Sequence, residues 1–255
     1  MRILLMTEDH DPFFHFLVES LNCLDFEIGH VHHPSPIESL NEFNPEIIIH
    51  NIKNASKIEY RDVITISIND LDEDNCFSLA KEDSKNFIKP FIKNMKFDLF
   101  DEKYKTDVVY VGDPNLLPDA SARISQNENI NMKMLNNTPT PTVNYVGTCS
   151  FDNYKKFFHM SKCTLLGRKD SNTDIFSFKL LDILASSGNP IVFKNDEQFV
   201  KDAEDAVFNG TSFRDNFLSR EEIFDKHTNH DRMSTIFSKI GLNKIAKMLL
   251  DRKGK

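Results

Sequence analysis

Tryptophan is absent from the sequence, and cysteine is scarce, with four residues spread over a chain of 255. No two cysteines form the closely spaced pair that zinc sites and redox-active disulfides use, so we expect neither kind of site. Scattered free thiols are typical of a reducing compartment, which predicts a cytoplasmic protein.

Long apolar runs are also absent from the sequence. No stretch approaches the roughly 18 apolar residues of a membrane-spanning helix. The short apolar run at the N-terminus is followed at once by acidic residues, unlike a secretory signal. We therefore expect no membrane span. The abundance of Asn, Lys, Ile and Asp suits an AT-rich genome, that of a low-GC bacterium or of a phage, and for a phage protein the cytoplasm is the host's.

Positive charge is in deficit, with a formal net charge of -8 and a pI of about 5.6. This balance argues against a broad surface that coats phosphates without regard to sequence. It leaves room for a local basic groove.

The chain instead contains short apolar runs that alternate with amphipathic segments. Strands are expected at 2–7, 26–33, 45–52 and 63–69, and again at 107–112, 143–147, 163–167 and 190–193. Those at 2–7 and 45–52 are expected to be buried. Helices are expected at 36–43, 151–162 and 176–187, with another beginning at Pro12 and mostly helical chain after residue 197. Strands separated by helices predict parallel sheets. The fold class is therefore α/β, with two Rossmann-like lobes whose parallel sheets face a cleft, at 1–105 and 106–255, and with a helical C-terminal segment.

The expected helix at 176–187 is apolar on most sides, but Lys179, Asp182 and Ser186 form a thin polar stripe. Such a stripe is usually the solvated face of a helix. Here it is narrow, and the helix follows the polar loop 167–174 at the end of a strand, where free amides make a ready anion site. Both interpretations stay open at this point.

Residues 107–242 resemble the C-terminal, donor-binding half of GT-B glycosyltransferases, of the spore-maturation-protein type within family 1. Four segments carry the resemblance, in the right order: DVVYVGD (107–113), FDNYKKFFHMSKCTLLG (151–167), FSFKLLDILASSGNPIVF (176–193) and HTNHDRMSTIF (227–237). The order of elements is also loosely similar to that of phage hydroxymethylcytosine DNA glucosyltransferases. The resemblance implies an enzyme that transfers a hexose or pentose from a nucleotide-sugar, typically UDP-linked.

The resemblance also implies roles for particular residues. Asp182 matches the acidic residue that accepts hydrogen bonds from the nucleotide ribose, and Lys179 the basic residue that faces the pyrophosphate. Gly112 matches the glycine loop after the lobe's first strand. His227 and Arg232 match the late motif, either beside the cleft or as a brace between the lobes.

Two departures from the family pattern stand out. Asp182 replaces the usual Glu, and an extra serine precedes Gly188.

A departing diphosphate needs positive charge and amide donors. Arg168, Lys169 and Lys179 are the expected donor-binding cations. No Asp-x-Asp motif stands where a metal-dependent enzyme would carry one, so we expect neither a divalent metal nor a cofactor beyond the nucleotide-sugar co-substrate.

The base that activates the acceptor is expected at the strand ends of the first lobe, which share one edge of a parallel sheet. The segment TEDHD follows the first strand, which makes His10, Asp9 and Asp11 the leading candidates. Three further histidines end the second and third strands and line the same expected cleft: His32, His33 and His50.

The acceptor is left open by the sequence. The first lobe is short, which suits either an open cleft for a polysaccharide or a second chain, including another copy, that completes the site. A small molecule is another candidate acceptor, and so is a hydroxymethylated DNA base. The interleaved Lys and Phe of 86–97 give the DNA base a little support, because such residues contact phosphates and stack on bases. The acidic net charge counts against it. The remaining alternative is a degenerate scaffold that binds a nucleotide or a protein without catalysis.

Overall fold

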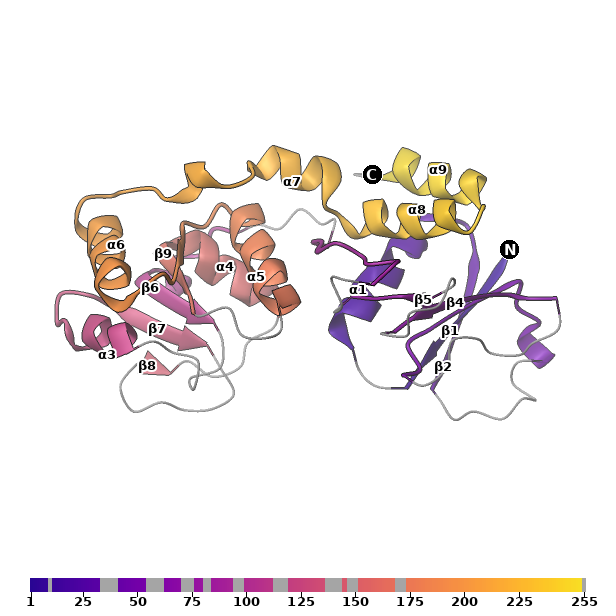
Figure 1. Ribbon diagram of the computed structural model, residues 1–255, viewed down its shortest axis with the longest axis horizontal. Helices are drawn as coiled ribbons and strands as arrows, with labels where there is room; N and C mark the ends of the chain where they lie inside the picture. Colours follow the sequence, from indigo (N-terminus) through magenta and orange to yellow (C-terminus); the bar gives the residue numbers. More distant parts are fainter. Residues whose placement is uncertain are drawn as a thin grey trace. The chain divides into compact units, whose positions relative to one another are not determined.

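The computed structural model describes residues 1–8, 11–32, 41–53, 62–69, 76–79, 84–93, 99–111, 119–135, 144–145, 151–167 and 173–253 (Figure 1). The chain divides into two compact units, Met1–Met95 with Lys226–Lys255, and Lys96–Asp225. Each unit contains one five-stranded parallel sheet. The predicted α/β class with two parallel sheets and a helical C-terminal segment is confirmed.

The sheet of the first unit has the strand order β2-β1-β3-β4-β5. Its strands are β1 (Arg2–Thr7), β2 (Glu27–His32), β3 (Ile47–His50), β4 (Ile64–Ile68) and β5 (Cys76–Phe77). The central strands β1, β3 and β4 are buried at nearly every position because parallel sheets are covered on both faces. The order reverses between β1 and β3, which is where ligands bind in open sheets of this kind.

Residues 41–43 of the first unit are helical, and four further helical segments have both ends in the described part of this unit. They are α1 (Pro12–Glu19), the short 3-10 helix η1 (Ser20–Cys23), α8 (Asn229–Lys239) and α9 (Asn243–Arg252). Helix α8 packs on α1 and α9, and the amide of Asn229 donates to the Phe16 carbonyl at 2.7 Å. A parallel bridge joins Ile92 to Thr228.

The C-terminal helices therefore belong to the first unit, although the sequence-based division placed all of 106–255 in the second lobe. After the second unit, the chain continues into α8, which packs on α1 of the first unit. A division into contiguous segments does not detect such packing between distant parts of the sequence.

The sheet of the second unit has the order β10-β9-β6-β7-β8. Its strands are β6 (Thr106–Val111), β7 (Met132–Leu135), β8 (Asn144–Tyr145), β9 (Ser161–Leu166) and β10 (Pro190–Val192). This is the strand order of Rossmann dinucleotide-binding sheets, with the reversal between β6 and β9.

Helices cover both faces of the second sheet (Figure 1). One core lies under α3 (Asp119–Gln126) and α6 (Asp196–Phe208), and the other under α4 (Phe151–Met160) and α5 (Thr173–Ala185). Shorter segments complete the described part: η2 (Glu102–Tyr104), η4 (Arg214–Asn216) and α7 (Arg220–Lys226). No helix in the described ranges is both long and apolar enough to cross a membrane.

The sequence analysis located most of these elements within a few residues. It missed β5, β7 and α3, which are short or polar, and its expected helix at 36–43 lies largely outside the described residues.

Candidate functional site

Helix α5 carries the polar stripe that the sequence singled out. Lys179 and Asp182 are half-buried, and the neighbouring Phe178, Ile183 and Leu184 are buried. Because α5 connects the parallel strands β9 and β10, it begins at the carboxyl edge of the sheet and runs back toward the other edge. Asp182 lies nine residues after Thr173, or about 13 Å along the helix, and Lys179 lies about one turn nearer the carboxyl edge.

The carboxylate of Asp182 faces a lysine from the neighbouring helix. Lys155 on α4 approaches it with an Nζ–Oδ1 distance of 3.6 Å, and the two side chains are 4% and 19% exposed. Oδ1 is inaccessible to solvent and accepts no hydrogen bond within the described part of the chain. The exposed fraction of Asp182 therefore leaves Oδ2 as the oxygen open to a ligand.

Burial raises the pKa of Asp182 to about 6, against the lowering effect of the Lys155 ammonium. At neutral pH the carboxylate is therefore largely ionised, but its ionised form is poorly stabilised. A carboxylate in this state gains from an added hydrogen-bond donor, such as a ligand hydroxyl.

The C-terminal end of α5 explains the extra serine before Gly188. The Gly188 amide donates to Ile183 O at 2.8 Å and the Ser187 amide to Leu184 O at 3.0 Å, as in a Schellman motif. Ser187 takes the left-handed position of this motif, with φ of 61°. A Cβ on Gly188 would lie 2.8 Å from Ile183 Cγ2, so the glycine is required by close approach and not by its φ.

Two arginines reach the last carbonyls of α5. Arg214 Nη2 donates to Leu184 O at 3.1 Å, and Arg220 Nε donates to Ala185 O at 2.9 Å. Cations at a helix C-terminus satisfy free carbonyls and oppose the helix dipole. The sequence analysis missed both residues, because no motif marks an arginine that acts on a distant helix end.

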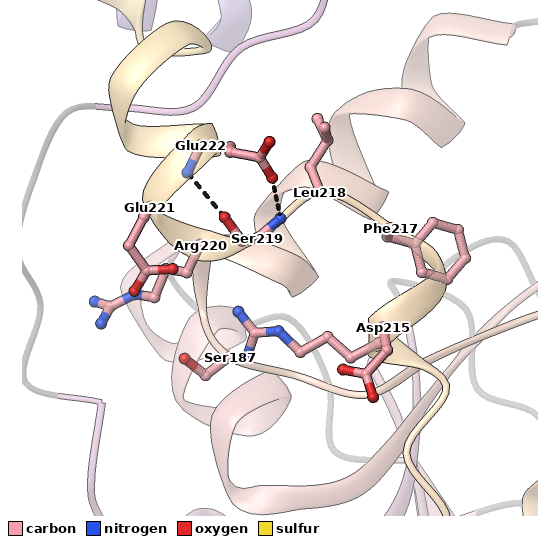
Figure 2. A pocket seen from close by; sticks show the side chains of 9 residues that line it. Ser187, Asp215, Phe217, Leu218, Ser219, Arg220, Glu221 and Glu222 are labelled. Carbon is pink, nitrogen blue, oxygen red and sulfur yellow. Dashed lines mark hydrogen bonds between the residues drawn. The ribbon is translucent and has the colours of Figure 1, made fainter.

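These arginines line a pocket of about 550 Å³ (Figure 2). Its other lining residues are Ser187, Asp215, Phe217, Leu218, Ser219, Glu221 and Glu222. Glu222 accepts from the Ser219 amide at 2.9 Å and its own amide donates to Ser219 Oγ at 3.1 Å, which fixes the start of α7 (Figure 2).

The carboxyl edge of the first sheet gathers polar groups from neighbouring strands. The register sets His32 beside Thr7 and His50 beside Met6. His50 is fully buried, and its Nδ1 accepts from the Ile52 amide at 3.3 Å, so that a neutral ring carries its proton on Nε2. His32 is exposed on the edge strand β2.

Two residues that the sequence analysis missed join the ends of β1 and β3. The Glu8 amide donates to Asn51 Oδ1 at 3.0 Å, and Glu8 Oε2 accepts from the Lys53 amide at 2.8 Å. Only their position directly after the two apolar runs could have indicated them. This pair holds the switch point of the first sheet together.

Asp11 lies at the start of α1, where its Oδ1 accepts from the Phe14 amide at 3.3 Å. This bond gives it a capping role. The other predicted residues of this loop and of the donor loops lie outside the described residues: Asp9, His10, His33, Gly112, Arg168 and Lys169.

His227 and Arg232 form a structural clasp inside the first unit. Arg232 Nη2 lies 2.8 Å from His227 Nδ1, and the guanidinium also donates to the carbonyls of Lys89, Pro90 and Lys226. Burial, and then the charge of Arg232, lower the pKa of His227, which suits a neutral ring that accepts this bond. The clasp fastens the segment around Pro90 to α8.

Comparison with known proteins gives only distant likenesses. No protein-family model matches the chain, and no curated protein matches it. Among solved structures, it is similar to AviGT4, a glycosyltransferase involved in avilamycin A biosynthesis, with 9% identity, a TM-score of 0.48 and coverage of 99% of this chain and 97% of that one.

The E. coli heptosyltransferase WaaC with ADP shows 9% identity and a TM-score of 0.38, over 81% of this chain and 99% of that one. A transcriptional activator of the comK gene from Bacillus halodurans shows 12% identity and a TM-score of 0.29, over 84% and 100%. None of these TM-scores reaches 0.5, so none of these likenesses bears on the function of this chain.

Proposed function

We propose that the chain is a glycosyltransferase that moves a sugar from a nucleotide-sugar donor, a UDP-sugar in the first instance, to a hydroxyl acceptor. The observation that carries the proposal is the incompletely satisfied Asp182 on α5, one turn after Lys179. These are the two positions at which the sequence resembles the ribose and pyrophosphate contacts of GT-B enzymes.

The topology of the second unit supports a donor site there. Strands β6 and β9 are paired side by side, and the strand order reverses between them. The chain leaves their carboxyl ends into segments 112–118 and 168–172, which contain Gly112, Arg168 and Lys169. Ligands of such sheets bind at this kind of position.

In this proposal Asp182 Oδ2 accepts hydrogen bonds from the donor ribose, and the Lys179 ammonium faces the diphosphate. The ammonium stabilises charge as it develops on the leaving group. Lys155 holds the buried side of the Asp182 carboxylate and so orients its free oxygen.

The acceptor base in this proposal comes from the loop after β1, with His10 or Asp9 ahead of Asp11. Asp11 already uses one oxygen on the Phe14 amide. His32 and the buried His50 lie at the same sheet edge and are the next candidates.

Isothermal titration of UDP and UDP-sugars into the wild type, Asp182→Asn and Lys179→Ala tests the donor site. Asparagine removes the negative charge of Asp182 but keeps its shape and an oxygen near Lys155, whereas alanine would leave the Lys155 ammonium with no polar group opposite it. We expect Asp182→Asn to weaken binding by about 1–3 kcal/mol, the usual cost of losing a charged hydrogen-bond acceptor.

Lys201→Ala, an exposed change on α6, is the matched control for Lys179→Ala and should leave affinity unchanged. Unaltered nucleotide affinity in folded Asp182→Asn protein would remove Asp182 from the site. Turnover assays with the same sugars then decide the function: binding without turnover on any acceptor indicates a non-catalytic scaffold. Turnover that requires hydroxymethylated DNA would identify a modified base as the acceptor.

A further inference from the structure

A second pocket lies in the first unit, far along the sequence from the proposed donor residues. It has a volume of about 360 Å³ and lies between α8 and the chain around β5 and residue 88. Its lining residues are Phe77, Phe87, Ile88, Lys89, Arg232, Thr235, Ile236 and Lys239. We call it the α8 pocket.

The floor of the α8 pocket is apolar and rigidly built. Phe77, Ile88 and Ile236 are at most 4% exposed, while Phe87 is half-buried and so offers part of its ring. The Ile88 amide donates to Ser78 O at 2.8 Å, and a parallel bridge joins Ser78 to Phe87. The floor therefore continues the sheet beyond β5.

The rim of the α8 pocket is cationic, and none of its described lining residues is a carboxylate. Lys89, Arg232 and Lys239 line it, and none of the three makes an ion pair with another described residue. Lys239 Nζ donates to Asn86 Oδ1 at 3.2 Å and lies 5.9 Å from the centre of the Phe77 ring. In a chain with a net charge of -8, it is unusual for three cations without an ion-pair partner among the described residues to line one small pocket.

The three cations differ in what they offer. Arg232 uses four of its five N–H groups on carbonyls and on His227, so it contributes charge more than hydrogen bonds. Lys89 and Lys239 are exposed and end in ammonium groups. Such groups bind phosphate as point charges.

We infer that the α8 pocket binds a small phosphomonoester that carries one planar ring. The ring covers the apolar floor and meets Phe87, and the phosphate lies between Lys89 and Lys239. The volume is near the lower limit of small-molecule pockets, which suits one ring and one phosphate and excludes a larger body. The inference uses no residue of the proposed donor site and can be tested independently of it.

The first experiment compares three probes by isothermal titration on the full chain: phenyl phosphate, inorganic phosphate and phenol. Because the pocket offers both an apolar floor and a charged rim, phenyl phosphate should bind at least about tenfold more tightly than inorganic phosphate or phenol alone. Its affinity should also fall as salt is raised. Uridine monophosphate against uridine then tells whether a nucleoside monophosphate is accepted as the ring-bearing phosphate.

The second experiment changes the rim. Thr235 is exposed on α8, one turn before Lys239, so Thr235→Glu adds a carboxylate to the pocket and pairs with that lysine. We expect phenyl phosphate binding to weaken by about tenfold or more, whereas the matched Thr235→Gln keeps near-wild-type affinity.

A third variant set removes charge. Lys89→Ala with Lys239→Ala should weaken phenyl phosphate binding, and Lys244→Ala with Lys247→Ala on the exposed face of α9 should not. Equal affinity for phenyl phosphate and inorganic phosphate would overturn the inference, and so would binding that Thr235→Glu leaves intact. Lys179→Ala should alter UDP-sugar binding alone, which separates a failure of this pocket from a failure of the donor site.

Discussion

Each unit contains a largely buried pairing of lysine with aspartate, and the two pairings are built differently. In the first unit, Lys253 Nζ lies 2.8 and 2.7 Å from the two oxygens of Asp231. Asp231 Oδ2 also accepts from the Thr228 amide and hydroxyl, both at 2.8 Å, in the capping box of α8. In the second unit, Lys155 stands 3.6 Å from one oxygen of Asp182.

The difference separates a structural carboxylate from a candidate ligand-binding one. Both oxygens of Asp231 accept hydrogen bonds from residues of the first unit. Asp231 therefore caps the start of α8 and binds Lys253 at the end of the described chain. Asp182 is largely buried, its Oδ1 accepts no hydrogen bond from any described residue, and burial raises its pKa to about 6. Incompletely satisfied buried carboxylates are uncommon in structural roles, because burial without hydrogen bonds is costly.

The largest expected effect comes from breaking the pairing in the second unit. Lys155→Met should destabilise the protein by about 3–5 kcal/mol at neutral pH, because it leaves the Asp182 carboxylate buried without a cation. Urea denaturation measures this, and Lys156→Met on the same helix is the control, with an expected cost of about 1 kcal/mol or less. Equal costs for the two variants would show that the ion pair contributes little.

The pH dependence of stability sharpens the same comparison. The folded pKa of Asp182, about 6, lies above the ordinary value of 3.8. The folded state therefore binds the proton more tightly, and the stability from this residue is greatest below pH 4 and is lost as pH rises through 6. The loss should be roughly 1–3 kcal/mol.

Denaturation curves of the wild type and Asp182→Asn between pH 4 and 7.5 check this expectation. The wild type should lose stability relative to the variant as pH rises, because asparagine does not titrate. A constant difference between the two proteins across this range would show that Asp182 has an ordinary pKa.

Breaking the pairing in the first unit should cost less stability than breaking the pairing in the second. Asp231→Asn weakens the ion pair with Lys253 but keeps oxygen and nitrogen near Thr228, so we expect a cost of about 1–2 kcal/mol. Thermal unfolding measures it. A cost as large as that of Lys155→Met would abolish the distinction drawn between the two pairings.

The smallest expected effect has the opposite sign and lies at the end of α5. Ser187→Gly relieves a left-handed backbone position and should stabilise the protein by about 0.5–1 kcal/mol. Gly188→Ala, one residue on, should destabilise it, because the added Cβ would meet Ile183 Cγ2 at 2.8 Å. Thermal unfolding of the two variants tests whether the left-handed backbone at Ser187 and the close approach at Gly188 affect stability as expected.

Much of the fold follows from the sequence because its signals are local. The runs at 2–7 and 45–52 contain the continuous apolar stretches ILLM and III, as is typical of strands covered on both faces, and β1 and β3 lie inside these runs. The missed strands β5 and β7 have two and four residues, and such lengths give little periodicity to detect. The polar stripe of α5 was visible in the sequence because it depends only on the spacing of residues along one helix.

What the sequence by itself determined is the α/β class, the approximate place of most strands, and the position of Lys179 and Asp182 on one helix face. Tertiary structure alone decided that α8 and α9 return to the first unit, that Lys155 reaches Asp182, and that Arg214 and Arg220 close the end of α5. It also decided that Phe77 and Lys239, 162 residues apart, share one pocket. The physical reason is that backbone pattern depends on neighbours in the chain, whereas burial, pairing of charges and the closing of pockets depend on packing between segments that are distant in sequence.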